Sequence, residues 1–207
     1  MTVASEIVEL GASFFRRGLT FGRTGNLSAV DTDGTILMTP TGVSLDRLRS
    51  DALSRVTADG HHVDGPRPTK EAFLHLALYR ARPHAKAVVH THSTHSVAVS
   101  CLRDVDSSNA LPVLTAYYAM RVGALPLLPY HAPGDSALGA MAEVAASRHH
   151  ALLLANHGPI VAGDDLDAAA DALEEIEETA KLFLLLRGQA VRPVTDEHAR
   201  RLREAYR

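Results

Sequence analysis

Residues 87–95, with the sequence AVVHTHSTH, place two histidines, His90 and His92, at the end of an apolar and β-branched run. On a β-strand, residues i and i+2 point to the same face with α-carbons about 6–7 Å apart. Two imidazoles placed in this way can bind one metal ion through nitrogens at about 2 Å. His157 ends a second apolar run, at 151–158, and Glu71 opens the helix expected before the first strand. Together these residues predict a divalent-metal site, with zinc as the most suitable ion.

Two further histidines leave alternatives open around these ligands. His75 follows Glu71 by four residues, so these two side chains could instead form a ligand pair on one face of a helix. His95 follows His92 by three residues and could support a ligand through a hydrogen bond. For His90 and His92 together, a ligand role is favoured because apolar strands rarely bury two unpaired imidazoles.

An acidic run, LEEIEETAK at 173–181, is a second candidate metal site, which we reject. The surrounding pattern predicts a long helix over 166–188 with apolar residues such as Ile176 on its buried side, so its glutamates should face solvent. Glu177 and Lys181 would then form an i,i+4 pair that contributes only about 0.5 kcal/mol.

Composition narrows the class of protein. A length of 207 residues fits one domain over 1–207, and a net charge of −3 argues against a general affinity for nucleic acid. Cys101 is the single cysteine, which excludes an internal disulfide and is compatible with a reducing compartment; we expect it in the core. The N-terminus carries Glu6 and Glu9 among its apolar residues, unlike a signal peptide, and no apolar run approaches the roughly 20 residues that span a bilayer. We therefore expect a cytoplasmic protein without a membrane partner.

Helical and alternating patterns succeed one another along the whole chain and predict a single α/β or α+β domain around a central sheet. The Asp33-Gly34 pair indicates a β-hairpin in the N-terminal region. The expected helices are 2–17, 69–82, a segment that begins near 93, 136–147 and 166–188. The expected strands include the two of the hairpin, 85–92, 112–120, 124–130 and 149–156.

Three polar turns offer hydroxyls, amides or backbone N–H groups beside a glycine or a helix start, which suits a phosphate group. Each turn alone is explained equally well by turn chemistry or helix capping, so only their combination with the metal site favours binding. The candidate phosphate-binding residues are Asn26 and Ser28 in GNLSA, Thr41 and Gly42 in TPTG, and Thr69 and Lys70 in PTKE.

The ordered set of motifs T-G-N-L-S, T-P-T-G, P-T-K-E, V-V-H-T-H-S-x-H and N-H-G covers nearly the whole chain and resembles the class II aldolase/adducin family. The resemblance implies an α/β/α sandwich with a mainly antiparallel or mixed sheet. It also implies zinc, or another divalent ion such as Mn²⁺, held by His90, His92 and His157. Glu71 would be the acid/base carboxylate and a further metal contact. The phosphate pocket would be lined by Asn26, Thr41, Gly42 and Thr69.

Within this family, the chain is most similar to members that decarboxylate a 3-oxo-tetronate 4-phosphate. Lys70 directly precedes Glu71, where the aldolases typically have two serines before the glutamate. Two further stretches, 92–102 and 115–135, carry the same resemblance. The implied reaction runs through a zinc-stabilised enediolate to dihydroxyacetone phosphate and CO₂, with Lys70 holding the substrate carboxylate or its phosphate. A sugar-phosphate aldolase of the fuculose-phosphate type and a ribulose-phosphate 4-epimerase are the alternatives, and a non-catalytic adducin-like module is the weakest.

The family also implies a homo-oligomer, commonly a tetramer with sites between subunits. In related aldolases a tyrosine from the neighbouring subunit donates a proton in the site. Tyr117 and Tyr118 are the candidates for that role, and the sequence does not choose between them. An aromatic pair that packs an oligomer interface explains the same residues equally well.

Overall fold

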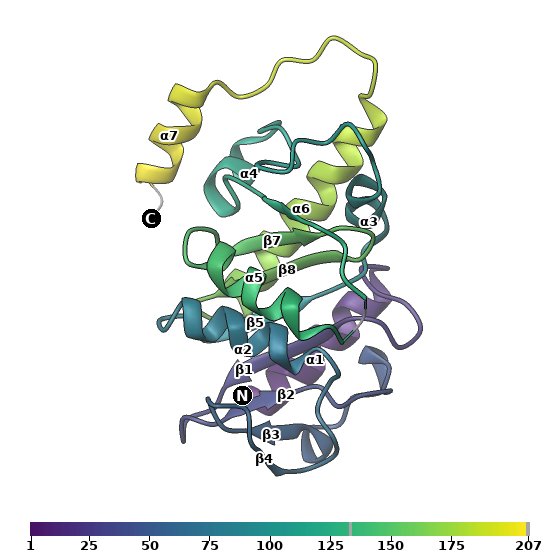
Figure 1. Ribbon diagram of the computed structural model, residues 1–207, viewed down its shortest axis with the longest axis vertical. Coiled ribbons are helices and arrows are strands. Elements are labelled where there is room, and N and C mark those ends of the chain that lie inside the picture. The colour runs from purple at the N-terminus through teal and green to yellow at the C-terminus, as the bar shows by residue number, and fades with distance from the viewer. Residues whose placement is uncertain (133, 206–207) are drawn as a thin grey trace.

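One mixed sheet of eight strands organises the part of the chain that the computed structural model describes, residues 1–132 and 134–205 (Figure 1). Its order is β4-β3-β2-β1-β5-β8-β7-β6, and only β6 and β7 pair in parallel. The strands are β1 (Asn26–Val30), β2 (Ile36–Met38), β3 (Ser54–Val56), β4 (His62–Asp64), β5 (Ala87–His90), β6 (Leu127–Leu128), β7 (Ala151–Leu154) and β8 (Gly158–Gly163). Residues 133, 206 and 207 of the expected domain lie outside the described residues.

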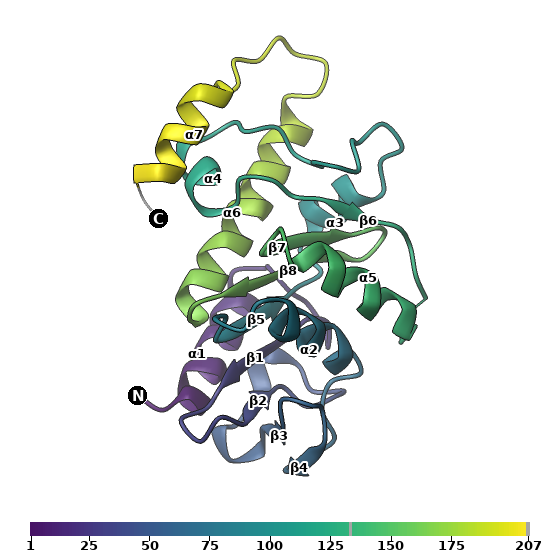
Figure 2. The same ribbon diagram turned by 60° about the vertical axis from the view of Figure 1, so that its left-hand side comes forward.

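Helices cover both faces of the sheet, which confirms the expected α/β/α sandwich (Figures 1 and 2). Two helices lie on one face, α2 (Ala72–Ala81) and α5 (Ser136–Ala146). The other face packs against α1 (Val3–Arg16), α3 (Thr94–Ser100) and α6 (Leu166–Leu185). At one end of the molecule, α4 (Ala116–Arg121) lies beside the C-terminal α7 (Asp196–Ala205).

The central strand β5 packs against the helices on both faces of the sheet, and the alternation of its side chains sets the direction of its last residue, His90. Ala87 and Val89 belong to the core beneath α1 and α6, whereas Val88 belongs to the core beneath α2 and α5. Successive side chains of a strand alternate between faces, so a strand buried on both sides is apolar at every position. By the same alternation, His90 faces the α2 side of the sheet and points toward Glu71, the residue that precedes α2.

Several expected elements are confirmed, one is wrong, and two observed elements were not predicted. The hairpin forms β1 and β2, with Ser28 opposite Met38, and the helices expected near 136–147 and 166–188 are α5 and α6. The strand expected at 112–120 is wrong: its second half is α4, where the Thr115 hydroxyl caps the helix by accepting a hydrogen bond from the Tyr118 backbone. The sequence analysis predicted neither β8 nor α7.

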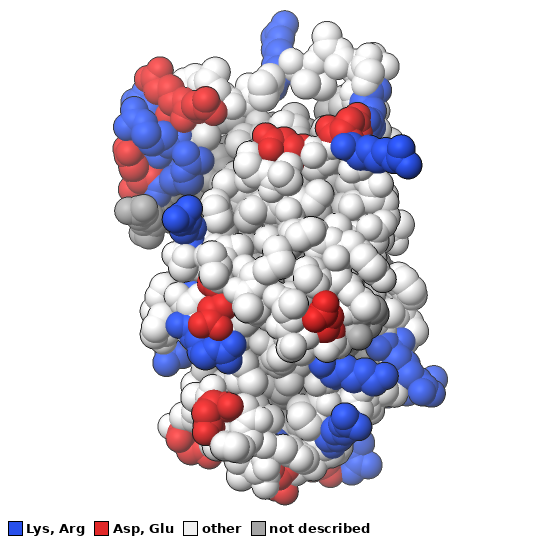
Figure 3. All heavy atoms as spheres, viewed as in Figure 1, with Lys and Arg blue, Asp and Glu red and all other residues white. Residues whose placement is uncertain are grey.

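Two surface features complete the description. The expectation of a buried Cys101 is wrong, because the residue ends α3 and is exposed. Among the described helices, none combines the length and apolar character needed to cross a bilayer. On the face drawn in Figure 3, basic and acidic side chains are interspersed and form no single basic surface.

Candidate metal centre

Four side chains from separate parts of the chain converge where the central strand β5 ends and the neighbouring strand β8 begins. Glu71, His90, His92 and His157 each offer a ligand atom, and these atoms all lie within 4.8 Å of one another. His90 ends β5, Glu71 immediately precedes α2, and His157 lies in the turn between β7 and β8. The strand expected at 85–92 ends earlier, at His90, so His92 reaches the cluster from the following loop and not from the same strand face.

A glycine allows the His157 turn to approach the other two histidines. Gly158 has φ 148°, and a Cβ atom at this position would lie 2.3 Å from the Thr91 carbonyl oxygen. Thr91 stands between His90 and His92, so any larger residue at 158 would push His157 away from them. The glycine of the N-H-G motif therefore has a steric role in assembling the cluster.

The distances within the cluster match the coordination shell of a small divalent ion. His157 Nε2 lies 3.0 Å from His92 Nε2, 3.3 Å from His90 Nε2 and 2.9 Å from Glu71 Oε1. Glu71 Oε2 lies 3.4 Å from His90 Nε2. Four ligands arranged tetrahedrally at zinc distances stand about 3.3 Å from one another. These four separations are therefore close to those within a four-coordinate zinc site.

Hydrogen bonding also points to a cation among the histidines. His90 Nδ1 lies 2.8 Å from the Pro159 carbonyl oxygen, which can only accept, so Nδ1 carries the proton and Nε2 presents a lone pair. His157 Nε2 carries at most one proton, which cannot serve His90, His92 and Glu71 at once. Because His90 is completely buried, its lone pair has no access to bulk water. A bound cation would satisfy this donor set.

The electrostatic state of the cluster suits a divalent metal. Burial lowers the pKa of His90 to about 4, and burial together with the neighbouring imidazoles lowers the pKa of His92 to about 3. For Glu71, burial acts to raise the pKa, but His90, His157 and the Asn26 amide outweigh it and lower the pKa below its usual value. Neutral imidazoles beside an ionised carboxylate are the protonation state that binds metal.

The alternative helical ligand pair is not assembled. His75 is completely buried in α2, and its ring bonds Asn26 Oδ1 through Nε2 and Ser28 Oγ through Nδ1. Both ring nitrogens are thus occupied, and His75 is outside the four-residue cluster. Ser28 is equally buried behind Asn26, so we leave it out of the proposed phosphate pocket.

The other polar turns lie side by side near Glu71. Thr41 N donates to the Arg67 carbonyl, and Thr69 N donates to the Thr39 carbonyl, which joins the TPTG turn to the PTKE turn. The Thr69 hydroxyl accepts a hydrogen bond from Glu71 N at 3.3 Å. Asn26 Nδ2 donates to Glu71 Oε2 at 2.7 Å. Gly42 follows in the same turn as Thr41, and Lys70 is exposed beside Glu71. Their role in binding substrate stays a prediction.

The two candidate tyrosines occupy different environments on α4. Tyr118 is completely buried, and its hydroxyl has no hydrogen-bond partner among the described residues. Burial raises the pKa of its phenol. Tyr117 is 58% exposed, and the Arg121 guanidinium lies 5.3 Å from the centre of its ring. Of the two, only Tyr117 is available to another subunit.

The segment after His92 is held by the buried carboxylate of Glu177, which the sequence analysis predicted to face solvent. Glu177 is only 6% exposed and accepts hydrogen bonds from the backbone N–H groups of His95 and Ser96 and from both of their side chains. The expected solvated position of Glu177 is therefore wrong, as is its pairing with Lys181, which lies near Glu178 instead. His95 supports α3 and not a metal ligand.

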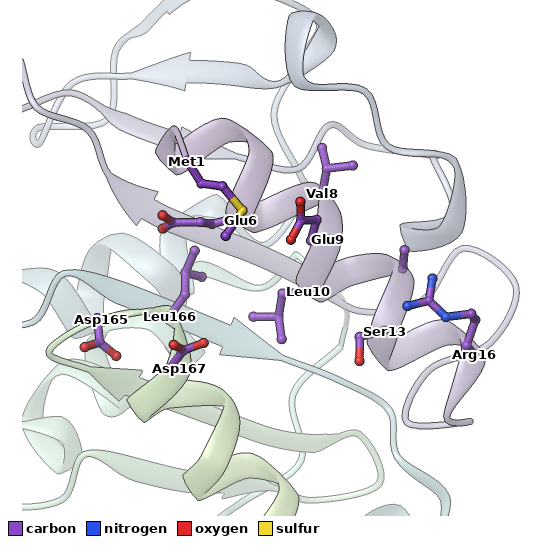
Figure 4. Close-up of a pocket in the computed structure, with 11 residues that line it drawn as sticks. Met1, Glu6, Val8, Glu9, Leu10, Ser13, Arg16, Asp165, Leu166 and Asp167 are labelled. Atoms are coloured by element: carbon purple, nitrogen blue, oxygen red, sulfur yellow. The ribbon is translucent and has the colours of Figure 1, made fainter.

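A separate groove of about 840 Å³ lies between α1 and the start of α6 (Figure 4). Its lining includes the four carboxylates of Glu6, Glu9, Asp165 and Asp167, against one guanidinium, that of Arg16, and none of the predicted site residues. A wall of this charge would repel a phosphorylated substrate, so we assign it no part in the site.

Comparison with known proteins gives a consistent result. The Class II Aldolase and Adducin N-terminal domain model matches residues 5–184. A 3-oxo-tetronate 4-phosphate decarboxylase from Pectobacterium atrosepticum is 49% identical over 191 residues, 92% of this chain and 88% of the relative. An L-fuculose phosphate aldolase from Escherichia coli is 33% identical, over 88% of this chain and 82% of the aldolase. The crystal structure of YgbL from Escherichia coli, described as an aldolase/epimerase/decarboxylase, superposes with a TM-score of 0.94 at 45% identity, covering 97% of both chains.

Proposed function

Because this chain belongs to the class II aldolase and adducin family, we propose that it is a metal-dependent carbon–carbon lyase that decarboxylates a 3-oxo-tetronate 4-phosphate. The products would be CO₂ and dihydroxyacetone phosphate. The observation that carries the proposal is the convergence of three histidines and Glu71 within 4.8 Å. The decarboxylase relative at 49% identity supports this choice of substrate.

We propose that His90, His92 and His157 hold a divalent ion, with zinc as the best match and manganese as the alternative. Three neutral nitrogen donors and one carboxylate are a common zinc ligand set. When bound, the ion supplies Lewis-acid stabilisation of the negative charge that departure of CO₂ leaves on the substrate. The carboxylate of Glu71 lies at the same point and is the proposed acid/base group.

The proposed reaction needs one proton transfer by this chain. The C1–C2 bond of the substrate breaks, CO₂ leaves, and the electron pair of the bond remains as an enediolate over C2 and C3. Glu71 then delivers a proton to C2, which gives dihydroxyacetone phosphate. Because the Glu71 pKa is lowered, the carboxylate is ionised at neutral pH, so the proton that it delivers comes from solvent, and one H⁺ is consumed for each CO₂ released.

The polar turns beside Glu71 are the proposed binding site for the substrate's charged ends. Asn26, Thr41, Gly42 and Thr69 would bind the phosphate through amide, hydroxyl and backbone N–H groups. Lys70 is exposed next to Glu71, where its ammonium group could hold either the substrate carboxylate or the phosphate.

A sugar-phosphate aldolase is the second candidate, supported by the L-fuculose phosphate aldolase at 33% identity. An aldolase would produce the same enediolate with an aldehyde as the leaving group, so the metal and Glu71 would serve both reactions. A ribulose-phosphate 4-epimerase is a further alternative. An adducin-like module without activity is the weakest, since the four proposed ligands are all present and grouped.

We further propose that the chain assembles into a homo-oligomer, a tetramer as expected from the family. An apolar surface patch on α5 and β6 supports contact with another subunit: it is lined by Pro126, Leu128, Met141 and Val144, of which Met141 is 37% and Val144 75% exposed, whereas Leu128 is buried. Exposed Tyr117 would be free to reach a neighbouring site. A cytoplasmic location stays a prediction from the sequence.

The proposal is tested with purified protein of known metal content. The protein is incubated with both C2 epimers of 3-oxo-tetronate 4-phosphate, and separately with fuculose 1-phosphate and ribulose 5-phosphate. We expect CO₂ and dihydroxyacetone phosphate from one 3-oxo acid, loss of activity after chelation, and recovery with zinc or manganese. Full activity after exhaustive chelation, or turnover of fuculose or ribulose phosphate alone, would contradict the proposal.

A further inference from the structure

A continuous chain of hydrogen bonds runs from the interior of the α2 layer to Glu71. Tyr79 Oη lies 2.9 Å from Ser28 Oγ, which lies 2.7 Å from His75 Nδ1. His75 Nε2 lies 2.5 Å from Asn26 Oδ1, and Asn26 Nδ2 lies 2.7 Å from Glu71 Oε2. Of these five hydrogen-bonded residues, the proposed mechanism uses only Asn26 and Glu71.

The chemistry of the groups allows one direction for every hydrogen bond. Asn26 donates its NH₂ group to Glu71 Oε2, which turns the amide's carbonyl oxygen toward His75. That oxygen only accepts, so His75 must carry its proton on Nε2 and present a lone pair on Nδ1. Ser28 must then donate to Nδ1, and Tyr79 must donate to the Ser28 oxygen. Each residue therefore fixes the orientation of the next.

Burial makes this arrangement selective. His75 and Ser28 have no exposed surface and Asn26 is 5% exposed, so water does not compete for these groups. Burial lowers the pKa of His75 to about 4, so the ring is neutral at physiological pH. A neutral imidazole donates from one nitrogen only. Rotation of the Asn26 amide would set its NH₂ group against the Nε2 proton and its oxygen against the Glu71 carboxylate.

We propose that His75 is a positioning residue for the reaction: it holds the Asn26 amide with its NH₂ group toward Glu71 and so fixes the carboxylate that transfers the proton. This inference rests on the proposed acid/base role of Glu71. If His75 had only a structural role, loss of either of its two hydrogen bonds would lower stability, and neither loss would lower activity more than the other. The two hydrogen bonds can be removed separately, which distinguishes the two cases.

Two substitutions form a matched pair at this position. In His75→Gln the side-chain amide can reach the place of Nε2 and donate to Asn26, whereas in His75→Asn the shorter amide can replace only Nδ1 and accept from Ser28. We expect His75→Asn to lower kcat about 100-fold, the effect of misplacing a reacting group, with little change in KM. His75→Gln should stay within about tenfold of wild type, and both variants should keep the wild-type metal content. The same pair at His150, whose Nε2 donates to the Arg121 carbonyl, is the control and should leave kcat unchanged.

Equal kcat values for folded His75→Gln and His75→Asn would overturn the inference, as would a loss of kcat that only follows the unfolded fraction. If neither variant folds, neutron diffraction on wild-type protein decides: deuterium on Nε2 alone supports the inference, and deuterium on Nδ1 overturns it. Wild-type protein without activity on any of the sugar phosphates would refute the proposed function, and this inference with it. An active wild type with equal variants refutes the inference alone.

Discussion

Substituting Glu177 by glutamine tests whether the segment after His92 depends on a buried carboxylate. Glu177 Oε1 accepts from the backbone N–H and the Nδ1 of His95, at 2.9 and 2.8 Å. Its Oε2 accepts from the backbone N–H and the Oγ of Ser96, at 2.9 and 2.6 Å. Each carboxylate oxygen thus serves two donors at the first turn of α3, the helix that begins two residues after His92.

The magnitude follows from counting the donors that lose an acceptor. Glutamine keeps one oxygen and replaces the other with an NH₂ group, so in either orientation one backbone N–H loses its acceptor, while the side chain beside it, the Ser96 hydroxyl or the His95 ring, can turn and accept from the new NH₂ group. A buried donor left without a partner costs about 1–3 kcal/mol. We therefore expect the free energy of unfolding to fall by about 1–3 kcal/mol. For a chain of this size, each kcal/mol lowers Tm by about 2–4 °C.

The assay is urea unfolding of metal-free protein, with Glu178→Gln as the matched control. Glu178 is the next residue on α6, its side chain is 67% exposed, and its nearest cation is Lys181 at 3.9 Å. Exposed pairs of this kind contribute about 0–1 kcal/mol. If the unfolding free energies of the two variants differ by less than 1 kcal/mol, Glu177 does not stabilise α3 as described. Metal titration of the same proteins should show an affinity about tenfold weaker in Glu177→Gln, because His92 loses its fixed neighbour.

Three further outcomes follow from the site. Glu71→Gln should lower kcat by about 10²–10⁴ while three histidines still hold the metal; wild-type turnover would remove Glu71 from the mechanism. Tyr118→Phe should leave the unfolding free energy unchanged or raise it by about 1 kcal/mol, whereas Tyr117→Phe should lower turnover without affecting unfolding; the opposite assignment would show that Tyr118 reaches a site. In metal-free protein, His75 stays neutral in the fold to about pH 4, while the unfolded chain takes up a proton below about 6.5. The contribution of His75 to stability should therefore be fully present above pH 6.5 and fall by roughly 3 kcal/mol toward pH 4, and His75→Gln should lose less over that window in urea unfolding at each pH; identical pH profiles would contradict the assignment.

The cluster of Glu71 and three histidines could be located from the sequence because His90 and His157 follow buried apolar runs. His90 follows an apolar run whose side chains alternate between two covered faces, and His157 follows another run that pairs in the same sheet. Buried runs of this kind must lie together in a core, so polar residues at their ends meet at one edge. The error at His92 changed the element that carries it, from strand to loop, and not its place in the cluster.

The residues that support the cluster could not be found in this way, because their partners are distant in sequence. Glu177 satisfies the helical pattern of a solvated position, and only the packing of α3 on α6 brings it against four donors, 81 and 82 residues away. His75 was a candidate ligand because it follows Glu71 by four residues. The pairing of β1 with β5 instead places Asn26 opposite His90, where its amide bonds both His75 and Glu71. In each case the local pattern describes which face of a helix a residue occupies, while its role depends on what the fold sets against that face. A charged or titratable residue on a long helix beside a metal ligand is therefore better judged by the donors it meets than by its spacing.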